Sequence, residues 1–292
     1  MSLWENIAAD IAAATGRQAE LSGQSSTGGG CINQAARVNY GDTSYFVKLN
    51  TAGKADMFAA EALGLQELRS SRTLKIPEPV CHGDDGESSW LVLEDLELGG
   101  RGDLAALGEG LAALHRVTRQ QFGWDTDNTI GSTLQVNTCH HDWVAFWREH
   151  RLQFQLELAA RNGHGGRLQS QGERLLDLFP ALFTDYTPEA SLLHGDLWSG
   201  NYAFTNSGEA TIFDPAVYYG DREADLAMTE LFGGFGSDFY AAYRADYPVD
   251  PGYGVRKTLY NLYHILNHLN IFGDAYRLQA YRMMDSLLSE LT

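Results

Sequence analysis

Basic residues are scarce in this 292-residue sequence. Lysine and arginine total 21 against 38 aspartates and glutamates, which gives a formal charge of −17 at pH 7. Nucleic-acid binding requires a basic face that neutralises phosphates, and the lysines and arginines form no cluster along the chain. We therefore expect no nucleic-acid partner, and the same charge balance argues against an anionic membrane surface.

Long hydrophobic runs and cysteine pairs are missing as well. No apolar stretch reaches the roughly 18 residues that a membrane span requires. Residues 1–16 contain no lysine or arginine and no uninterrupted apolar core, so they do not resemble a secretory signal. The three cysteines form no CxxC pair, which favours a reduced, cytoplasmic setting. Hydrophobic residues nevertheless make up 44% of the chain, enough for a sizeable core.

The first third of the chain carries signals of both strands and helices. Apolar residues recur at helical spacing in two segments, 2–15 and 55–71. Three segments have the composition of strands, namely 34–40, 43–49 and 88–93. Because Gly41-Asp42 between the first two strands is typical of a tight turn, we expect these strands to form a hairpin.

The rest of the chain is mostly helical by the same criteria. Helices are predicted over 103–117, 141–161, 166–179, 222–232, 253–271 and 275–290. Two short strands interrupt them, at 192–194 and 211–213. We therefore expect an α+β fold in two lobes, with a small β-rich N-lobe over 1–94, a hinge over 95–102 and a larger helical C-lobe over 103–292.

The strongest chemical signal is the segment HGDLWSGN at 194–201, directly after a predicted strand. An aspartate followed five residues later by an asparagine is the layout of a phosphotransferase catalytic loop, and Asp214 comes 13 residues after Asn201 at the end of a second strand. Phosphoryl transfer requires a carboxylate for the acceptor hydroxyl and hard oxygen ligands for Mg²⁺. Asp196 suits the first task, and Asn201 with Asp214 suits the second.

The N-terminal region supplies residues suited to bind ATP. Lys48 lies in the predicted strand 43–49, from which its ammonium can reach the α- and β-phosphates. Glu61 follows 13 residues later on a predicted helix and can hold that lysine. Two segments offer backbone groups: the glycine run Gly28, Gly29 and Gly30 for the phosphates, and Leu93, Glu94 and Asp95 for adenine.

Each of these residues also has a plain structural interpretation. An aspartate after a strand can cap a turn, a strand lysine usually faces solvent, and surface glutamates are common. The glycine run matches neither standard nucleotide-binding fingerprint and can be a flexible turn. The joint spacing of Asp196, Asn201 and Asp214 is what favours catalysis over these alternatives.

Histidines and acids near the motif are given supporting roles. We expect His194 to hydrogen-bond the backbone and fix the loop rather than to transfer protons, and Asp225 to orient the loop through a buried hydrogen bond. His264 and His268 have a spacing that can bind metal, but the glutamate of an HExxH motif is missing, so core packing or cleft lining is favoured. The sequence His140-His141-Asp142 is interpreted as a helix start.

Several segments together resemble the fructosamine-3-kinase, or ketosamine kinase, family. They are SSTGGGCINQAARV, YFVKLN, LLHGDLWSGNYAF, IFDPAVYYGDREADLAMTELFGGF and YHILNHLNIFG. The tryptophan after HGDL is the most specific part of this resemblance. Because the family is similar in fold to aminoglycoside and choline phosphotransferases, the resemblance implies a two-lobed protein-kinase-like fold.

The resemblance also implies an activity. It is the ATP-dependent phosphorylation of the 3-hydroxyl of a ketosamine, the sugar adduct that glycation leaves on an amine, after which the unstable product sheds the sugar. Fructosamine, ribulosamine and erythrulosamine adducts remain open as acceptors, on small amines or on glycated proteins, and the chain is expected to be a monomer or a homodimer.

Residue roles carry over by motif. The resemblance implies that Asp196 accepts the proton, that Asn201 and Asp214 bind Mg²⁺, and that Lys48 and Glu61 anchor the phosphates. Trp198 is a family-specific residue on the substrate side or in loop packing, or else a core residue. Asp214 is followed by Pro-Ala rather than Phe-Gly, and no APE-type segment follows, so we expect no activation-loop phosphorylation switch.

Cys31 adjoins the glycine run. Nearby backbone amides favour a thiolate, and the resemblance implies a redox-sensitive cysteine here, so we hypothesise that its oxidation lowers activity. The plain alternative is a small buried apolar side chain.

Two rival functions stay open. One is an aminoglycoside- or choline-type small-molecule kinase, which would share the catalytic aspartate. The other is a catalytically dead kinase-like binding module, against which the presence of Lys48, Glu61, Asp196, Asn201 and Asp214 argues.

Overall fold

The computed structural model describes residues 2–27 and 33–292. The chain forms two compact units. Unit 1 comprises Met1–Asp103 and Tyr202–Pro215, and unit 2 comprises Leu104–Asn201 and Ala216–Thr292.

The segment 202–215 differs from the division that we predicted, because we assigned it to the helical C-lobe. Strands β10 (Tyr202–Phe204) and β11 (Ala210–Ile212) form an antiparallel hairpin. This hairpin joins unit 1 through backbone hydrogen bonds to Lys75, whose N–H donates to the Ala210 carbonyl (3.1 Å) and whose carbonyl accepts from the Ile212 N–H (3.2 Å). A pairing between segments more than 130 residues apart leaves no local signal in the sequence.

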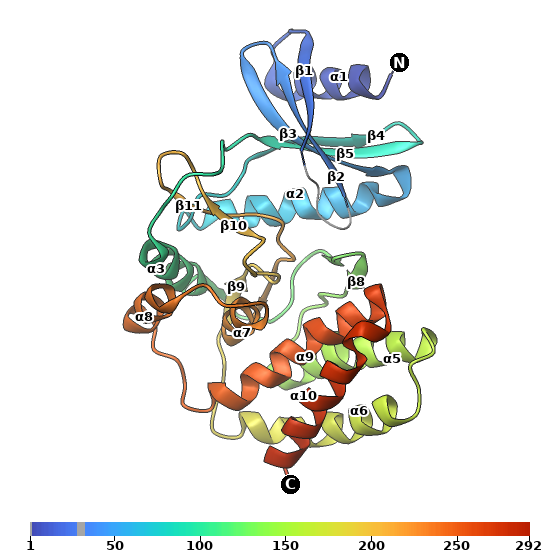
Figure 1. Ribbon diagram of the computed structural model, residues 1–292, viewed down its shortest axis with the longest axis vertical. Coiled ribbons are helices and arrows are strands. Elements are labelled where there is room, and N and C mark those ends of the chain that lie inside the picture. The colour runs from blue at the N-terminus through green and yellow to red at the C-terminus, as the bar shows by residue number, and fades with distance from the viewer. Residues whose placement is uncertain (1, 28–32) are drawn as a thin grey trace. The chain divides into compact units, whose positions relative to one another are not determined.

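A five-stranded antiparallel sheet forms the centre of unit 1, in the order β1-β2-β3-β5-β4 (Figure 1). Its strands are β1 (Leu21–Thr27), β2 (Gln34–Tyr40), β3 (Thr43–Thr51), β4 (Pro79–Asp84) and β5 (Ser88–Glu94). The predicted hairpin is confirmed, with Tyr40 opposite Thr43. We did not predict β1, which is polar after Leu21, or β4, which begins at a proline; both are edge strands, where either feature is tolerated.

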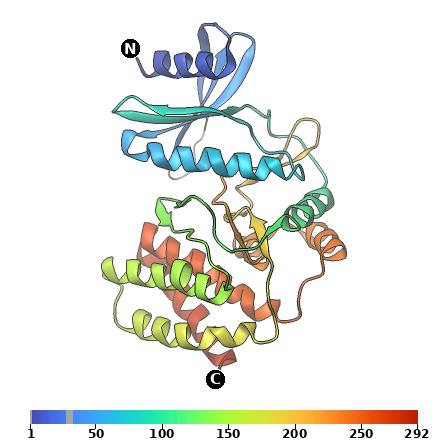
Figure 2. The ribbon, with the colours of Figure 1, turned by 180° about the vertical axis from the view of Figure 1, so that it is seen from behind.

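Two helices cover opposite faces of this sheet (Figures 1 and 2). Helix α1 (Leu3–Thr15) begins with a capping box between Ser2 and Glu5 and buries Ile7 and Ile11 against one face. Helix α2 (Ala55–Ser70) follows a short 3₁₀ turn and lies along the other face. Both helices confirm the predicted segments.

Unit 2 is mostly helical. Its helices are α3 (Leu104–His115), α4 (Trp143–Trp147), α5 (Phe154–Arg161), α6 (Arg167–Leu178), α7 (Glu223–Leu231), α8 (Ser237–Asp246), α9 (Tyr253–Phe272) and α10 (Arg277–Glu290). The single helix predicted over 141–161 is interrupted by a π-helical segment, Arg148–Gln153. Helix α8 was not predicted, and it packs beside α3 (Figure 1).

Short strands complete unit 2. Strands β6 (Thr118–Arg119), β9 (Ala190–Leu193) and β12 (Tyr218–Gly220) form a sheet in the order β12-β9-β6, and β7 (Asn128–Ile130) pairs with β8 (Thr133–Gln135). The predicted strands at 192–194 and 211–213 correspond to β9 and β11. Among the described residues, no helix combines the length and apolarity that a bilayer crossing needs.

Candidate active site

Lys48 lies on β3, which is flanked by β2 and β5 in the middle of the sheet. Successive side chains of a strand point to opposite faces, so Val47 joins the core under α1 while Lys48 faces α2. There the ammonium pairs with Glu61 of α2 and, at 2.5 Å, with Oδ1 of Asp214. The structure therefore brings together the predicted Lys48–Glu61 pair and adds Asp214 to it.

The charge of Lys48 is fixed by the two carboxylates beside it. Burial alone would lower the pKa of Lys48, but the negative charges of Asp214 and Glu61 outweigh it and raise the pKa above its usual value. Lys48 is thus an ammonium throughout the physiological pH range. The Asp214 side chain is 46% exposed whereas that of Glu61 is 11% exposed. Unit 1 therefore presents a fixed cation beside one accessible carboxylate, groups suited to phosphate and to a divalent cation.

The backbone of Asp214 is strained. Its φ of 57° lies in the left-handed region, which a residue other than glycine rarely adopts. Pro215 follows directly, and a residue before proline prefers extended conformations. Strain of this kind is concentrated at functional sites, where the surrounding structure compensates for it.

Leu93, Glu94 and Asp95 lie at the end of β5. Leu93 is buried in the sheet, whereas the Glu94 carboxylate pairs with Lys75 at 2.9 Å and Asp95 pairs with Arg37 at 2.5 Å. Because both carboxylates are engaged in ion pairs, an adenine contact at this position would use backbone groups, as the sequence predicted.

The motif of unit 2 begins directly after β9. The Nδ2 of Asn201 donates to the backbone carbonyl of Asp196 at 2.8 Å and to Oδ2 of the Asp196 side chain at 3.4 Å. The Asp196 N–H donates to Nδ1 of His194 at 3.2 Å. The loop thus curls on itself and places the side chains of Asp196 and Asn201 side by side, with His194 supporting the turn.

No residue with a side chain can take the place of Gly195 in this turn. Its φ is +82°, and an added Cβ would lie 2.0 Å from the Ala216 carbonyl oxygen. The two chain segments are held this close because the Ala216 N–H donates to the His194 carbonyl at 2.8 Å. The glycine of HGD is therefore required by a close backbone approach.

Trp198 extends from the same loop toward solvent, with 38% of its surface exposed. Its ring contacts Phe232 edge to face at a centroid distance of 6.2 Å. A Cβ at Gly200 would lie 2.3 Å from the indole, so the ring lies over that glycine. Trp198 is thus a partly exposed loop residue and not a core residue.

Asp225 of α7 holds the loop in place. One carboxylate oxygen accepts the His194 N–H at 2.7 Å and the other accepts the Gly195 N–H at 2.8 Å. The carboxylate is buried and also contacts Nε2 of His115 at 3.2 Å. Burial alone would raise the pKa of Asp225, but the hydrogen bond and charge of His115 outweigh it and lower the pKa. The buried hydrogen bond predicted for Asp225 is thus present.

His115 was missed by sequence reasoning. It ends α3, where a basic residue is ordinary, and lies 110 residues before Asp225 in the chain. Its ring nitrogens contact the carboxylate and the Tyr243 hydroxyl, the latter at 2.8 Å. No local pattern distinguishes it from a surface histidine.

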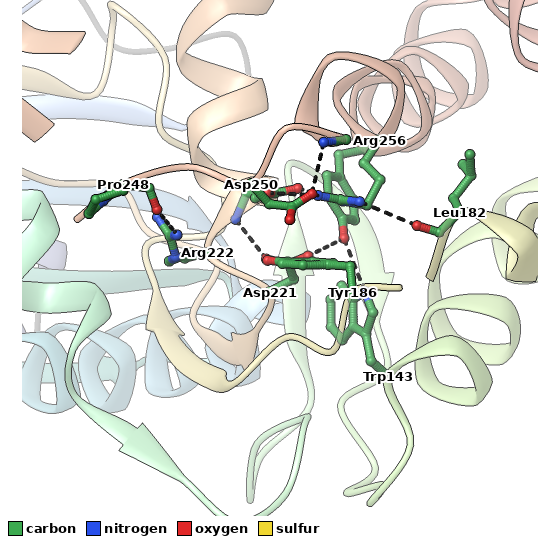
Figure 3. Close-up of polar contacts among 11 residues, drawn as sticks. Trp143, Leu182, Tyr186, Asp221, Arg222, Pro248, Asp250 and Arg256 are labelled. Carbon is green, nitrogen blue, oxygen red and sulfur yellow. Dashed lines mark hydrogen bonds and ion pairs between the residues drawn. The ribbon is translucent and has the colours of Figure 1, made fainter. Parts of the chain in front are cut away.

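The charged residues at the start of α7 are buried rather than solvated. Asp221 accepts hydrogen bonds from the hydroxyls of Tyr186 (2.9 Å) and Tyr260 (2.5 Å). Arg256 binds both carboxylate oxygens of Glu223 and also reaches Asp250 and the Leu182 carbonyl. Figure 3 shows Asp221 and Arg256 within this network of α7, α9 and the segments beside them. This network holds the start of α7, and hence Asp225, in a fixed position.

His264 of α9 packs in the core of unit 2, and core packing was one of the two interpretations that we favoured for it. It is buried, and its Nδ1 has no hydrogen-bond partner among the described residues. Burial lowers its pKa to about 3. Unfolding restores a pKa of about 6.5, so between these values the unfolded state binds a proton that the folded state excludes.

This difference predicts acid sensitivity. As the pH falls from about 6.5 toward about 3, His264 should lower the free energy of unfolding by about 1.4 kcal/mol per pH unit. Urea unfolding of the His264→Leu variant should therefore show a flatter dependence on pH than the wild type. The same substitution at the exposed His141 serves as the control. Equal slopes for wild type and His264→Leu would contradict the prediction.

A family model described as fructosamine kinase matches residues 3–290 of this chain. The chain belongs to the fructosamine kinase family. A probable ketoamine kinase of Synechocystis sp. is 48% identical over 289 residues, covering 98% of this chain and 97% of that protein. The chloroplastic protein-ribulosamine 3-kinase of Arabidopsis thaliana is 42% identical over 280 residues, covering 94% and 86%.

Solved structures agree with this assignment. A crystal structure provisionally identified as a fructosamine-3-kinase of Haemophilus somnus has a TM-score of 0.90 at 26% identity, covering 98% of this chain and 100% of that one. An aminoglycoside phosphotransferase (TM-score 0.62) and the choline kinase of Streptococcus pneumoniae (0.66), each 15% identical, share the fold alone. The α+β, protein-kinase-like fold predicted for this fructosamine kinase family member is confirmed.

The predicted site residues of this family member are distributed over both units. Lys48, Glu61 and Asp214 lie together in unit 1, and Asp196 and Asn201 lie together in unit 2. The predictions for Gly28, Gly29, Gly30 and Cys31 fall outside the described residues.

Proposed function

We propose that this fructosamine kinase family member is an ATP-dependent ketosamine 3-kinase. It transfers the γ-phosphoryl group of ATP to the 3-hydroxyl of the sugar that glycation attaches to an amine. The observation that carries the proposal is the Asp196–Asn201 loop, held by Asp225, in a chain that is 48% identical to a probable ketoamine kinase.

Asp196 is proposed as the proton acceptor for the sugar hydroxyl. Proton transfer requires a carboxylate held in one orientation within hydrogen-bond reach of the acceptor. The loop meets the first requirement, because the amide of Asn201 and the two N–H bonds to Asp225 fix the backbone on both sides of Asp196. Lys48 is proposed to bind the phosphates of ATP, with Glu61 keeping its ammonium in position.

Asn201 and Asp214 are proposed to hold Mg²⁺. Amide and carboxylate oxygens are the ligands that this ion prefers. The donor set fits in chemical type: the side-chain oxygen of Asn201 belongs to an amide whose Nδ2 donates to Asp196, and the Asp214 carboxylate is partly exposed. When bound, Mg²⁺ neutralises the charge that develops on the transferring phosphoryl group.

The acceptor is the decisive test. Purified protein with ATP and MgCl₂ should be assayed for ADP release with fructoselysine, ribuloselysine, erythruloselysine, an aminoglycoside and choline. We expect turnover with the ketosamines but not with the aminoglycoside or choline, because relatives of this chain are named for ketoamines and ribulosamines. Phosphorus NMR of the product should show a 3-phosphate that decays with release of the free amine.

The panel also separates the rival functions. Faster turnover of choline or the aminoglycoside would replace this proposal with a small-molecule kinase of that type. ATP binding without turnover of any acceptor would indicate a binding module. Comparing free ketosamines with glycated lysozyme in the same assay distinguishes small-molecule from protein-bound acceptors.

A further inference from the structure

Three potential metal ligands of unit 2 converge although they come from two segments of the chain. Nε2 of His140 lies 3.2 Å from Nε2 of His150 and 3.6 Å from a carboxylate oxygen of Glu149. One ligand atom from each residue lies within 4.8 Å of the other two, and no other such group occurs among the described residues. The sequence interpretation of His140-His141-Asp142 as a helix start holds for Asp142, which caps α4, but it overlooks His140.

Backbone structure and the packing of an aromatic ring fix the positions of both histidines. The backbone of His140 is fixed by two hydrogen bonds with Phe122, of 2.8 and 2.9 Å. His150 and Glu149 belong to the π-helical segment Arg148–Gln153, and such segments are frequent at functional sites. The ring of Phe146 contacts both imidazoles edge to face, at centroid distances of 6.2 and 5.4 Å. The ligand atoms are therefore prepositioned by packing.

The spacing is that of ligands around a tetrahedral ion. Two imidazole nitrogens bound to Zn²⁺ at about 2.0–2.1 Å lie about 3.4 Å from one another in tetrahedral geometry. The observed 3.2 Å separation is close to this value, so little movement is needed. Imidazole suits zinc and related transition ions, whereas Mg²⁺ prefers oxygen ligands.

We propose that His140, Glu149 and His150 form a binding site for Zn²⁺, with the fourth coordination position open to water. Access is provided on the glutamate side, because the side chains of Glu149 and His140 are 61% and 26% exposed whereas His150 is buried. In the metal-free chain the two imidazoles share a hydrogen bond, which zinc replaces with two metal–nitrogen bonds. The imidazole that donates this hydrogen bond then carries its proton on Nδ1 instead of Nε2, after exchange with solvent.

Zinc at this position would join residue 140 to the π-helical segment. The next residue of that segment, Arg151, donates to the Val136 carbonyl (2.6 Å) and to Oδ1 of Asn137 (2.7 Å). The same loop would then be tied to this helix at two places. The expected consequence is a more stable unit 2.

The experiment uses the full chain freed of metal with EDTA. Zinc binding is measured by titration in competition with a chromophoric chelator. Excess MgCl₂ is present so that Mg²⁺ occupies the oxygen-rich sites. In a separate sample, Co²⁺ is added and its visible spectrum is recorded. We expect one equivalent of zinc, a four-coordinate Co²⁺ spectrum and a rise in the melting temperature. His150→Gln should weaken zinc binding about 100-fold or more, since even changes behind the ligands weaken it 10- to 100-fold.

Two further variants keep the test decisive. Glu149→Gln changes an exposed residue, so it should fold normally and still weaken zinc binding. His141→Gln alters the adjacent exposed histidine, which lies outside the cluster, and should bind zinc like the wild type. Less than one equivalent bound by the wild type would overturn the proposal, as would zinc affinity that is unchanged in both His150→Gln and Glu149→Gln.

Discussion

Replacing Asp196 by alanine is expected to reduce kcat by a factor of about 10²–10⁴, the usual contribution of a positioned proton acceptor. Without the carboxylate, the sugar hydroxyl has no group to receive its proton as it attacks the phosphoryl group. The measurement is steady-state ADP release with the preferred ketosamine. ATP affinity, measured by calorimetry, should stay unchanged, because Lys48, the lysine proposed to bind the phosphates, belongs to unit 1.

Matched variants separate catalysis from folding in this prediction. Asp196→Asn keeps the shape of the side chain and removes its basicity, so it should lose nearly as much activity as Asp196→Ala. Asp185→Ala removes an exposed aspartate of the same unit and should retain full activity. If Asp196→Asn turned over at the wild-type rate, Asp196 would not be the proton acceptor.

The second large effect is expected at Arg256. Replacing it by methionine leaves the buried carboxylate of Glu223 without its partner, because Arg256 contacts both oxygens of that carboxylate, at 2.7 and 3.1 Å. Breaking a buried ion pair from one side costs about 3–5 kcal/mol of stability. Urea unfolding followed by tryptophan fluorescence measures the loss, since four of the six tryptophans lie in unit 2.

A double variant tests the physical reason for this loss. Replacing a whole buried ion pair by apolar residues is often neutral in stability. Arg256→Met combined with Glu223→Leu should therefore recover most of the stability that Arg256→Met alone loses. If the double variant were as unstable as the single one, lost packing of Arg256 over the Tyr186 ring, 3.8 Å away, would be the cause instead.

Local patterns predicted most of the elements. The apolar spacing of 55–71 corresponds to α2, and the turn at Gly41-Asp42 joins β2 to β3. The patterns failed where an element depends on its neighbours. Strand β1 has the sequence LSGQSST, in which leucine is the only large apolar residue, and it exists because β2 offers it a hydrogen-bonding edge. Helix α8 buries mainly Phe239 and Tyr243, too few apolar residues to show a clear helical period.

The loop over 194–201 was predictable because its residues are close in sequence. Asp196 and Asn201 share one turn, so their spacing alone places them together. Asp225 was expected to hold that loop, and it does so with both carboxylate oxygens. Its partner His115 was not expected, because the contact joins the end of α3 to α7.

The sequence by itself determined which residues are proposed for chemistry: the carboxylate proposed as proton acceptor, the oxygen ligands proposed for Mg²⁺ and the lysine follow from residue types at fixed spacing along short segments. Only the tertiary structure decided which charges are buried and which residues meet. It places Lys48 between Glu61 and Asp214, buries the acids at the start of α7, and joins His140 to His150. The physical reason is that burial and pairing depend on the path of the whole chain, whereas spacing is a local property.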